Sequence, residues 1–357
     1  MARRARLLAA NGTEKVPVGR GAARGNLPRL RRRGKACYTR RVFRNPRTLL
    51  SAALVAVAAV LWGLWPTVLR PAGLAAIQAA LVVQVVQALP APWMAWRARG
   101  GFRDRGAVAA LLAFGVFDAA QGALYFPALT RGPVAVAALT HYLGPILVAL
   151  AAPFVPGERA SRRAMLAAPL SLVGLLLVLG PPRTAPVLTA VLGAGSAFFG
   201  AAGLFAVRRA NRSFSPLAIC SLHAAISALL LLAAFGRAAV PPPGPGVIRV
   251  ALGGLVLGVG AGTVFFLAVK RVPAAIAATI TYVEPVMAAG VGALLLGEPL
   301  GGLAFAGATV VIGSGVWVAL EPLPPEAPAS AEDRTAAWAS GGVCGSARSS
   351  RGPRWQA

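Results

Sequence analysis

The chain is too apolar for a water-soluble protein of its length. It has 357 residues, of which 57% are hydrophobic and 13% are charged, and its mean hydropathy is +0.68. Soluble domains average about 45–50% apolar and about 25% charged residues. The polar residues here cannot cover a folded surface in water, so the surplus apolar area predicts a chain embedded in a lipid bilayer.

The net charge of +26 raises the alternative of nucleic-acid binding, which the positions of the charges argue against. Of the 36 Lys and Arg residues, 15 precede residue 48 and 4 follow residue 330, and nearly all the others lie in short gaps between apolar stretches. No aromatic and basic residues alternate in the tail. The pattern indicates membrane flanks, and we expect no nucleic-acid partner.

The ends of the chain are polar, and its cysteines are sparse. Residues 1–47 are rich in Arg, Gly and Pro without apolar periodicity, which predicts a basic disordered cytosolic tail, and residues 321–357 predict a second one. No cleavable signal peptide is evident. Cys37, Cys220 and Cys344 are far apart, so we expect neither a disulfide framework nor a metal site, and no cofactor.

Ten apolar stretches of near-spanning length follow one another from residue 48. They lie at about 48–69, 71–95, 106–128, 132–155, 163–181, 186–207, 214–236, 247–269, 272–296 and 300–320. With a cytosolic N-terminus, the cytosolic gaps hold 12 Lys and Arg residues and the outer gaps hold 5. This distribution obeys the positive-inside rule, and it predicts a multi-pass protein of the cell (inner or plasma) membrane with both termini in the cytosol.

An internal repeat divides the membrane region. Residues 128–158 and 268–298 are identical at 11 of 31 positions at a gapless offset of 140, including Arg131, Pro133, Tyr142, Pro145 and Glu158 with their partners. The two segments are five spans apart, so they cross the membrane in opposite directions. The fold class is therefore predicted as all-α integral membrane, with ten helices in two inverted five-helix repeats at 48–181 and 186–320.

The second copy carries a resemblance to a known family. The run AVKRVPAAIAATITYVEPVMAAGVGALLLGEPLGGLAFAGATVVIGSGVWVAL resembles the second-half signature of the EamA-type transporters of the drug/metabolite transporter superfamily. Residues 128–180 look like the first-half copy, and Trp62-Gly63 resembles the Trp-Gly of the first helix. The resemblance implies ten helices and transport of amino acids, metabolites or drugs, commonly coupled to protons. The first half departs from the second, because Gly144 stands opposite Glu284.

Two acidic residues lie deep in predicted spans, Asp118 and Glu284. An ionisable group at the bilayer centre costs about 2.5–3.5 kcal/mol even on lenient scales, and such groups usually mark solute or proton paths. The alternative is a structural carboxyl that joins two helices. We interpret both as candidates for binding substrate or protons.

The neighbours of Asp118 predict a polar face. Gly254, Gly258 and Gly262 form a small-residue stripe on the eighth span, and the repeat aligns it with Phe114, Asp118 and Gly122 on the third. Asp118 is therefore expected to face protein. Gln121 and Tyr125 follow it by three and seven residues and share its side of the helix, which predicts a cavity wall.

The neighbours of Glu284 predict a break. Pro285 removes a backbone donor beside it, and Pro145 does the same in the fourth span. Tyr282 precedes Glu284, and His141 and Tyr142 occupy the matching turn. His141 is either a proton carrier or a hydrogen-bonded packing residue.

The remaining polar and aromatic residues are weaker candidates. Trp62 and Trp65 are expected either to wall a cavity or to lie in an interfacial belt, and Gln78, Gln84 and Gln87 are expected to face a cavity. Glu158 and Glu298 are assigned structural contacts with Arg or backbone at helix ends, and His223 is the weaker of the two histidines.

Together these features predict a secondary transporter that works by alternating access and exports small organic solutes such as amino acids or related metabolites. Its expected partners are a small-molecule substrate, the lipid bilayer and, as candidate coupling ions, protons. The repeat implies no particular oligomeric state. The alternatives are a membrane-embedded enzyme that acts on lipid and a sensor or scaffold, neither of which needs carboxyls at the membrane midplane between inverted halves.

Overall fold

The computed structural model describes residues 46–131, 133–159, 161–180, 186–296 and 301–321. All of them belong to one unit, Arg44–Leu323. The tails expected at 1–47 and 321–357 fall almost wholly outside the described residues, as does Glu298. Every regular element in the described ranges is helical.

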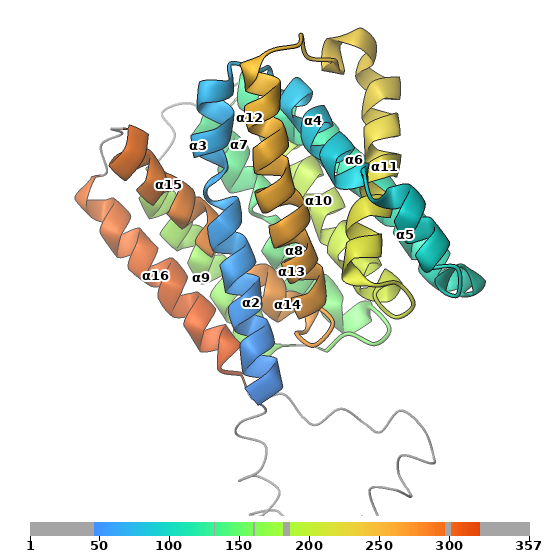
Figure 1. Cartoon of the computed structure of the whole chain (residues 1–357). Helices are drawn as coiled ribbons and strands as arrows, with labels where there is room; N and C mark the ends of the chain where they lie inside the picture. Colours follow the sequence, from blue (N-terminus) through green and yellow to red (C-terminus); the bar gives the residue numbers. More distant parts are fainter. Residues whose placement is uncertain (1–45, 132, 160, 181–185, 297–300, 322–357) are drawn as a thin grey trace, which may run out of the picture. The chain divides into compact units, whose positions relative to one another are not determined.

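Ten helical segments of the described chain are long and apolar enough to cross a membrane. They are Arg47–Ala72, Ala76–Arg97, Arg105–Ala128, Ala135–Phe154, Arg162–Leu179, Val187–Ala210, Pro216–Ala239, Pro245–Ala268, Ala274–Leu295 and Gly302–Ala319. Each agrees with a stretch predicted from sequence to within a few residues. The first span begins and the last span ends at the same end of the bundle (Figure 1).

Several spans are built from more than one helix. The first five contain α2 (Pro46–Trp62), α3 (Trp65–Leu69), η1 (Arg70–Ala72), α4 (Ala76–Ala88), α5 (Ala91–Arg97), α6 (Arg105–Arg131), α7 (Val134–His141), α8 (Gly144–Ala151), η3 (Ala152–Phe154) and α9 (Arg162–Leu179). The last five contain α10 (Val187–Ala210), α11 (Pro216–Phe235), η4 (Gly236–Ala239), α12 (Pro245–Gly253), η5 (Gly254–Gly260), α13 (Ala261–Ala268), α14 (Ala274–Ile280), α15 (Val283–Leu296) and α16 (Gly302–Ala319).

Polar residues and glycines define where the spans begin and end. The Ser161 hydroxyl accepts a hydrogen bond from the Ala164 amide at 2.9 Å, and the Asp104 carboxylate accepts one from the Ala107 amide at 3.1 Å. These contacts satisfy amides that have no partner within the first turn of a helix. Gly180 and Gly236 follow α9 and α11 with φ of 73° and 54°, a left-handed backbone that stops a helix.

The fourth and ninth spans are interrupted at equivalent positions. α7 ends at His141 and α8 begins at Gly144, while α14 ends at Ile280 and α15 begins at Val283. Pro145 and Pro285 lie in the first turn of the second half-helix, where a missing backbone N–H leaves no hydrogen bond unmade. The two prolines thus place a pair of helix breaks where the repeats face each other.

The helix packing follows a two-fold relation between the repeats. The third span packs on the sixth (α6 on α10), and their equivalents, the eighth and the first, pack in the same way (α13 on α2). Equivalent spans also contact each other directly, the second with the seventh (α4 with α11) and the fifth with the tenth (α9 with α16). The Tyr282 hydroxyl donates a hydrogen bond to the Tyr142 carbonyl at 2.6 Å, and the two rings are 5.8 Å apart. Equivalent residues can touch only close to the axis that relates them, so this pair marks the axis of two inverted five-helix repeats.

The glycine stripe of the eighth span lies at a helix contact, as predicted. A Cβ at Gly258 would lie 2.7 Å from Nε2 of Gln87, and a Cβ at Gly262 would lie 3.5 Å from Sγ of Cys220. The sequence did not predict that η5, which holds Gly254 and Gly258, is π-helical. The predicted counterpart on α6 is incomplete, because a Cβ at Gly122 would meet only Phe126 of the same helix.

Candidate functional site

A cavity of about 420 Å³ lies between the two repeats. This volume falls within the range of about 300–1,000 Å³ that is usual for small-molecule sites. Both repeats contribute to its walls. Its polar and aromatic lining residues are Trp62, Trp65, Gln84, Gln87, Phe114, Asp118, Gln121, His141, Tyr142, His223, Phe265, Phe266, Thr281 and Glu284.

Asp118 reaches the cavity from the middle of α6. Nε2 of Gln84, on α4, donates a hydrogen bond to its carboxylate at 2.5 Å. His223, on α11, lies within electrostatic reach of the same carboxylate. Nδ1 of His223 is 2.7 Å from the Ile219 carbonyl, which can only accept, so this nitrogen carries a proton. His223, the weaker histidine candidate from the sequence, thus lines the same cavity as Asp118.

Glu284 reaches the cavity from the first turn of α15, directly after the helix break. It is half-buried, and the cavity wall beside it is formed by Tyr142 and Thr281. The Tyr142 side chain is the hydrogen-bonding group that faces its carboxyl. Its equivalent in the first repeat, Gly144, lines the same cavity without a side chain. The two halves therefore present different chemistry at matching places.

His141 lies at the end of α7 and is held on two sides. Its Nδ1 is 2.8 Å from the Ser196 hydroxyl, on α10. The Tyr125 ring stacks on its imidazole with centroids 4.2 Å apart. The Ser196 hydroxyl in turn donates to the Gly193 carbonyl at 2.6 Å, so it accepts from Nδ1–H of His141. This arrangement places a proton on Nδ1 of His141.

Aromatic side chains form much of the remaining wall. Nε1 of Trp62 donates to the Leu257 carbonyl at 2.9 Å, and its ring lies 5.1 Å from that of Phe265. Phe114 packs edge-on against Phe266 at 5.6 Å. Trp62 therefore stands in the cavity wall and not in an interfacial belt. None of the three phenylalanines was expected in the cavity wall from the sequence.

Three predicted cavity residues lie elsewhere. Tyr282 is fully buried, and its hydroxyl is committed to the Tyr142 carbonyl. Tyr125 is not among the lining residues and stands behind His141. The side chain of Gln78 caps α4 by accepting from the Ala75 amide at 3.1 Å. Tyr282 and Tyr125 thus support the site residues, whereas Gln78 lies at a helix end.

The described lining of the cavity contains acidic side chains but no Lys or Arg. The acidic side chains are the carboxyls of Asp118 and Glu284. Of the two prolines, Pro145 lines the cavity and Pro285 does not. No three His, Cys, Asp or Glu side chains come together as a metal site anywhere in the described part of the chain. The cavity can therefore attract a cationic group but offers no cationic side chain to an anion.

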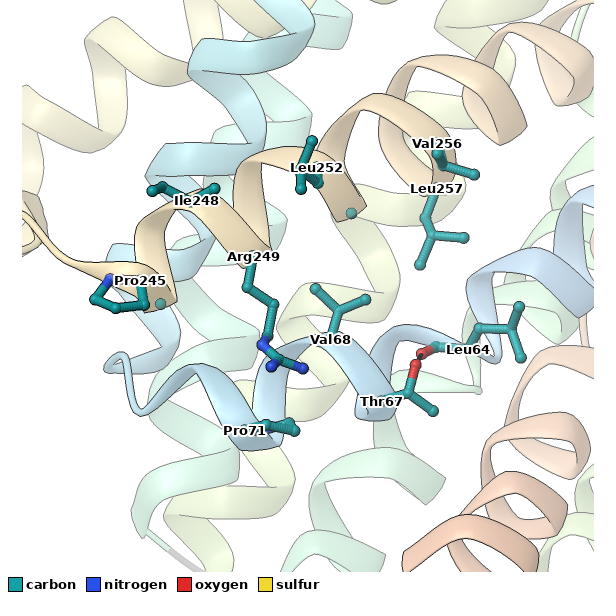
Figure 2. Close-up of a pocket in the computed structure, with 12 residues that line it drawn as sticks. Leu64, Thr67, Val68, Pro71, Pro245, Ile248, Arg249, Leu252, Val256 and Leu257 are labelled. Atoms are coloured by element: carbon teal, nitrogen blue, oxygen red, sulfur yellow. Dashed lines mark hydrogen bonds between the residues drawn. The ribbon is translucent and has the colours of Figure 1, made fainter.

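A second pocket is a lateral groove between α3 and α12 and shares no lining residue with the central cavity (Figure 2). Ile248, Leu252 and Val256 on its rim are exposed on the outer face of the bundle. In a membrane this face meets lipid, so the groove does not face the interior of the bundle as the central cavity does.

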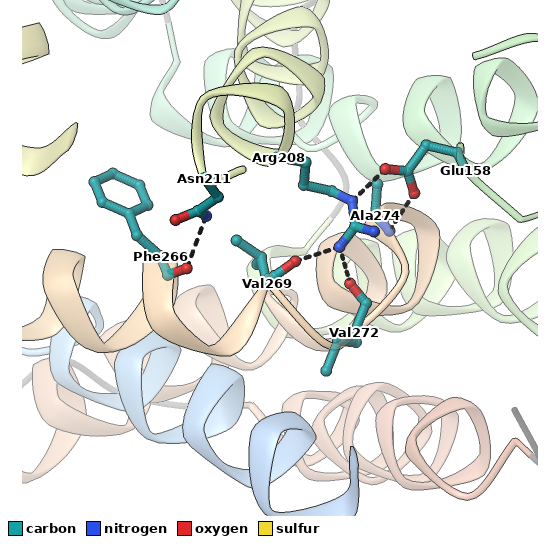
Figure 3. Close-up of polar contacts among 7 residues, drawn as sticks. All are labelled: Glu158, Arg208, Asn211, Phe266, Val269, Val272 and Ala274. Carbon is teal, nitrogen blue, oxygen red and sulfur yellow. Dashed lines mark hydrogen bonds and ion pairs between the residues drawn. The ribbon is translucent and has the colours of Figure 1, made fainter. Parts of the chain in front are cut away.

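At one end of the bundle, polar contacts join the two repeats (Figure 3). Glu158, which follows η3 of the first repeat, pairs with Arg208 of α10 and accepts a hydrogen bond from the Ala274 amide at 3.1 Å. Arg208 also donates to the carbonyls of Val269 and Val272. The structural role predicted for Glu158, contact with Arg and backbone, is confirmed.

A second cluster at the same end was not predicted from sequence. Arg209 binds both carboxylate oxygens of Asp104 at 2.8 and 3.0 Å, and the Ser213 hydroxyl donates to Asp104 at 2.7 Å. The hydrogen bonds from Arg209, then from Ser213 and the Ala107 amide, hold the pKa of Asp104 well below its usual range. The loop before α6 is thus joined to the end of α10.

Two inverted five-helix repeats around a central cavity at their seam define a multi-pass membrane protein with the architecture of alternating-access carriers. Comparison with protein-family models identifies the family. The EamA-like transporter family matches residues 49–180 and again residues 187–320. The chain belongs to this family, as its motifs suggested.

A solved structure supports the fold. A crystal structure described only as that of a protein superposes with a TM-score of 0.61 at 22% identity, over 75% of this chain and 96% of the other. At that identity the likeness concerns the fold alone. The comparison with curated proteins gave no match.

Proposed function

We propose that this protein is a secondary transporter that exports a small organic solute bearing an amine, such as an amino acid or a related metabolite, in exchange for protons. The observation that carries the proposal is the Glu284 carboxyl, which reaches the central cavity at the break between α14 and α15. A carboxylate there binds an ammonium group or a proton, but not both. Competition of this kind is the simplest way to couple two fluxes.

The chemistry of the cavity supports an amine as the recognised group. Asp118 and Glu284 supply acceptors and negative charge, and the described lining holds no Lys or Arg to pair with an anion. The rings of Trp62, Phe114 and Phe265 add surfaces on which a cation is favoured by about 0.5–2 kcal/mol. They also suit an apolar solute body.

The asymmetry between the repeats gives the solute one preferred charge contact near the axis. Glu284 carries a carboxyl and follows a helix break, whereas its counterpart Gly144 leaves space at the start of α8. A solute can therefore occupy the Gly144 side while its amine lies at Glu284. Gln121 and His141 lie on the same lining and offer hydrogen bonds to other polar groups of the solute.

The polar contacts that join the repeats at one end of the bundle support alternating access. Glu158 of the first repeat is paired with Arg208 of the second, and Arg208 also binds two carbonyls beyond α13. Opening that end requires these contacts to separate together, which suits a two-state gate between repeats. By the positive-inside rule this end faces the cytosol, together with both termini.

Transport in proteoliposomes tests the proposal. A thermal-shift screen of the purified protein against amines, amino acids, sugars and nucleosides first identifies a solute, because binding raises stability by mass action. We expect an amine-bearing solute to accumulate inside vesicles with an acidic interior, since protons leave as solute enters. Solute exchange that proceeds at equal rate with and without a proton gradient would contradict the coupling, and no exchange of any hit would contradict transport itself.

A further inference from the structure

The lateral groove between α3 and α12 has the shape and polarity of a lipid site. Its volume is about 600 Å³, and one wall comes from Leu64, Thr67, Val68 and Pro71 (Figure 2). The opposite wall comes from α12 and the start of η5. The groove opens to the face of the bundle that meets lipid, because Ile248, Leu252 and Val256 are largely exposed there.

Two glycines bring the walls of the groove together at its floor. A Cβ on Gly246 would collide with the Ala72 carbonyl, and a Cβ on Gly253 would collide with the Val68 side chain. Arg249 lies three residues after the first glycine and four before the second, so it leaves α12 on the same face. Figure 2 shows its guanidinium extending over the groove toward Val68 and Pro71.

Arg249 has no protein counter-ion in the described structure. Neither a hydrogen bond nor an ion pair joins it to any described residue. It is the fifth residue of α12, the helix that opens the eighth span at Pro245. At 1.5 Å per residue it lies about 6 Å below the end of that span, which is the depth of the boundary between headgroups and acyl chains.

The groove becomes apolar toward the membrane centre. Beyond Arg249 it is lined by Leu252, about 4.5 Å farther along the helix axis, and then by Val256 and Leu257, which begin about 10 Å from Arg249. A single positive charge near the membrane surface followed by an apolar channel complements an amphiphile with an anionic head and a hydrocarbon tail.

We propose that this groove binds one anionic phospholipid, with its phosphate on the Arg249 guanidinium and an acyl chain along Leu252 and Val256. Arg forms bidentate hydrogen bonds with phosphate oxygens, and these strengthen where water is scarce. Behind the lipid, the Leu257 carbonyl accepts the hydrogen bond of Trp62, which lines the central cavity. The lipid therefore packs on the outer side of the cavity wall.

Lipid retention and thermal stability test this site. Protein purified in detergent is titrated with phosphatidylglycerol, phosphatidylcholine or soluble glycerol phosphate, and bound lipid is counted by native mass spectrometry. Arg249→Gln removes the charge, and Leu252→Trp fills the groove while Arg249 remains. Arg237→Gln is the matched control, because Arg237 is exposed in η4 on the loop that leads to α12, outside the groove.

We expect the wild type and Arg237→Gln to retain one phosphatidylglycerol and to be stabilised by it more than by phosphatidylcholine. Arg249→Gln should bind it about fivefold more weakly, and Leu252→Trp should also lose it. Equal retention in Arg249→Gln, or equal effects of the two lipids, would overturn the proposal. Stabilisation by glycerol phosphate alone would overturn the lipid proposal and identify a soluble anion as the occupant of the groove. If native mass spectrometry showed a wild-type dimer that Arg249→Gln no longer forms, the occupant would be a second copy of the chain.

Discussion

Glu284 and Gly144 occupy matching positions in the two repeats, yet only Glu284 carries an ionisable group. Both line the central cavity next to a helix break. Asp118 lies on the third span and accepts a hydrogen bond from Gln84, so part of its hydrogen-bonding capacity is already used. At the scale of single residues, Glu284 is therefore the carboxyl with more freedom to exchange partners.

The sequence predicted the charged residues of the cavity better than its apolar walls. Asp118 and Glu284 could be found because an ionisable group inside a span is costly and therefore informative. Phe114, Phe265 and Phe266 could not, since a phenylalanine suits lipid, core and cavity equally well. The spacing of four residues between Phe114 and Asp118 was the one available signal for the first of them.

Asp104 predicts how stability responds to acid. Its pKa is held below the ordinary value of 3.8 by Arg209, so the folded state binds fewer protons than the unfolded state at low pH. The contribution of Asp104 to stability is complete above the ordinary value and falls as the pH drops below it. We expect the melting temperature of the wild type to fall more steeply than that of Asp104→Asn between about pH 5 and pH 3. Parallel pH profiles would contradict this role.

At the scale of elements, the helix breaks and the glycine contacts set the positions of the site residues. A helix break at Pro285 was predicted from the sequence, and the 140-residue repeat predicted the equivalent break at Pro145. The π-helical segment η5 was not foreseen, because π-helical geometry has no simple sequence pattern. It includes Leu257, whose carbonyl holds Trp62 in the cavity wall.

The crossing of α9 and α16 gives a test of packing. A Cβ on Gly307 would collide with the Gly174 carbonyl and approach the Val178 amide to 2.8 Å, and neither backbone group can move alone. We expect Gly307→Ala to destabilise the protein by about 1–3 kcal/mol, measured as thermal unfolding in detergent. Gly313→Ala, on the same helix where nothing lies within 4 Å, is the control and should be neutral or slightly stabilising. Equal melting temperatures for the two variants would refute the close crossing.

At the scale of the whole molecule, the number of spans and their inversion were predictable from the sequence, whereas the gate was not. Hydropathy, loop charge and the 140-residue offset each gave independent support for ten spans. The Glu158–Arg208 contact joins residues 50 positions apart across the two repeats, and no periodic pattern relates them. Contacts of this kind follow from packing and not from local sequence.

The inverted topology places two equivalent loops on opposite sides of the membrane. Pro156 and Gly301 are exposed and belong to the loops after the fourth and ninth spans. After Cys37 and Cys344 are replaced by Ser, cysteines at these positions should react with an impermeant reagent from opposite sides, with position 156 on the cytosolic side. The buried Cys220 serves as an internal control that should stay unlabelled. Labelling of both positions from one side would remove the inverted repeat.

The most direct measurement of the central claim is the pH dependence of solute flux in proteoliposomes that contain wild type, Glu284→Gln or Glu298→Gln. Glu284→Gln keeps the shape and hydrogen bonding of the side chain and removes its charge, so we expect a folded protein whose flux falls about tenfold to a hundredfold and no longer responds to pH. Glu298→Gln makes the same change farther along the sequence, after the ninth span, and should stay close to wild type. Wild-type flux and pH response in Glu284→Gln would contradict the account and leave Asp118 as the next carboxyl to test.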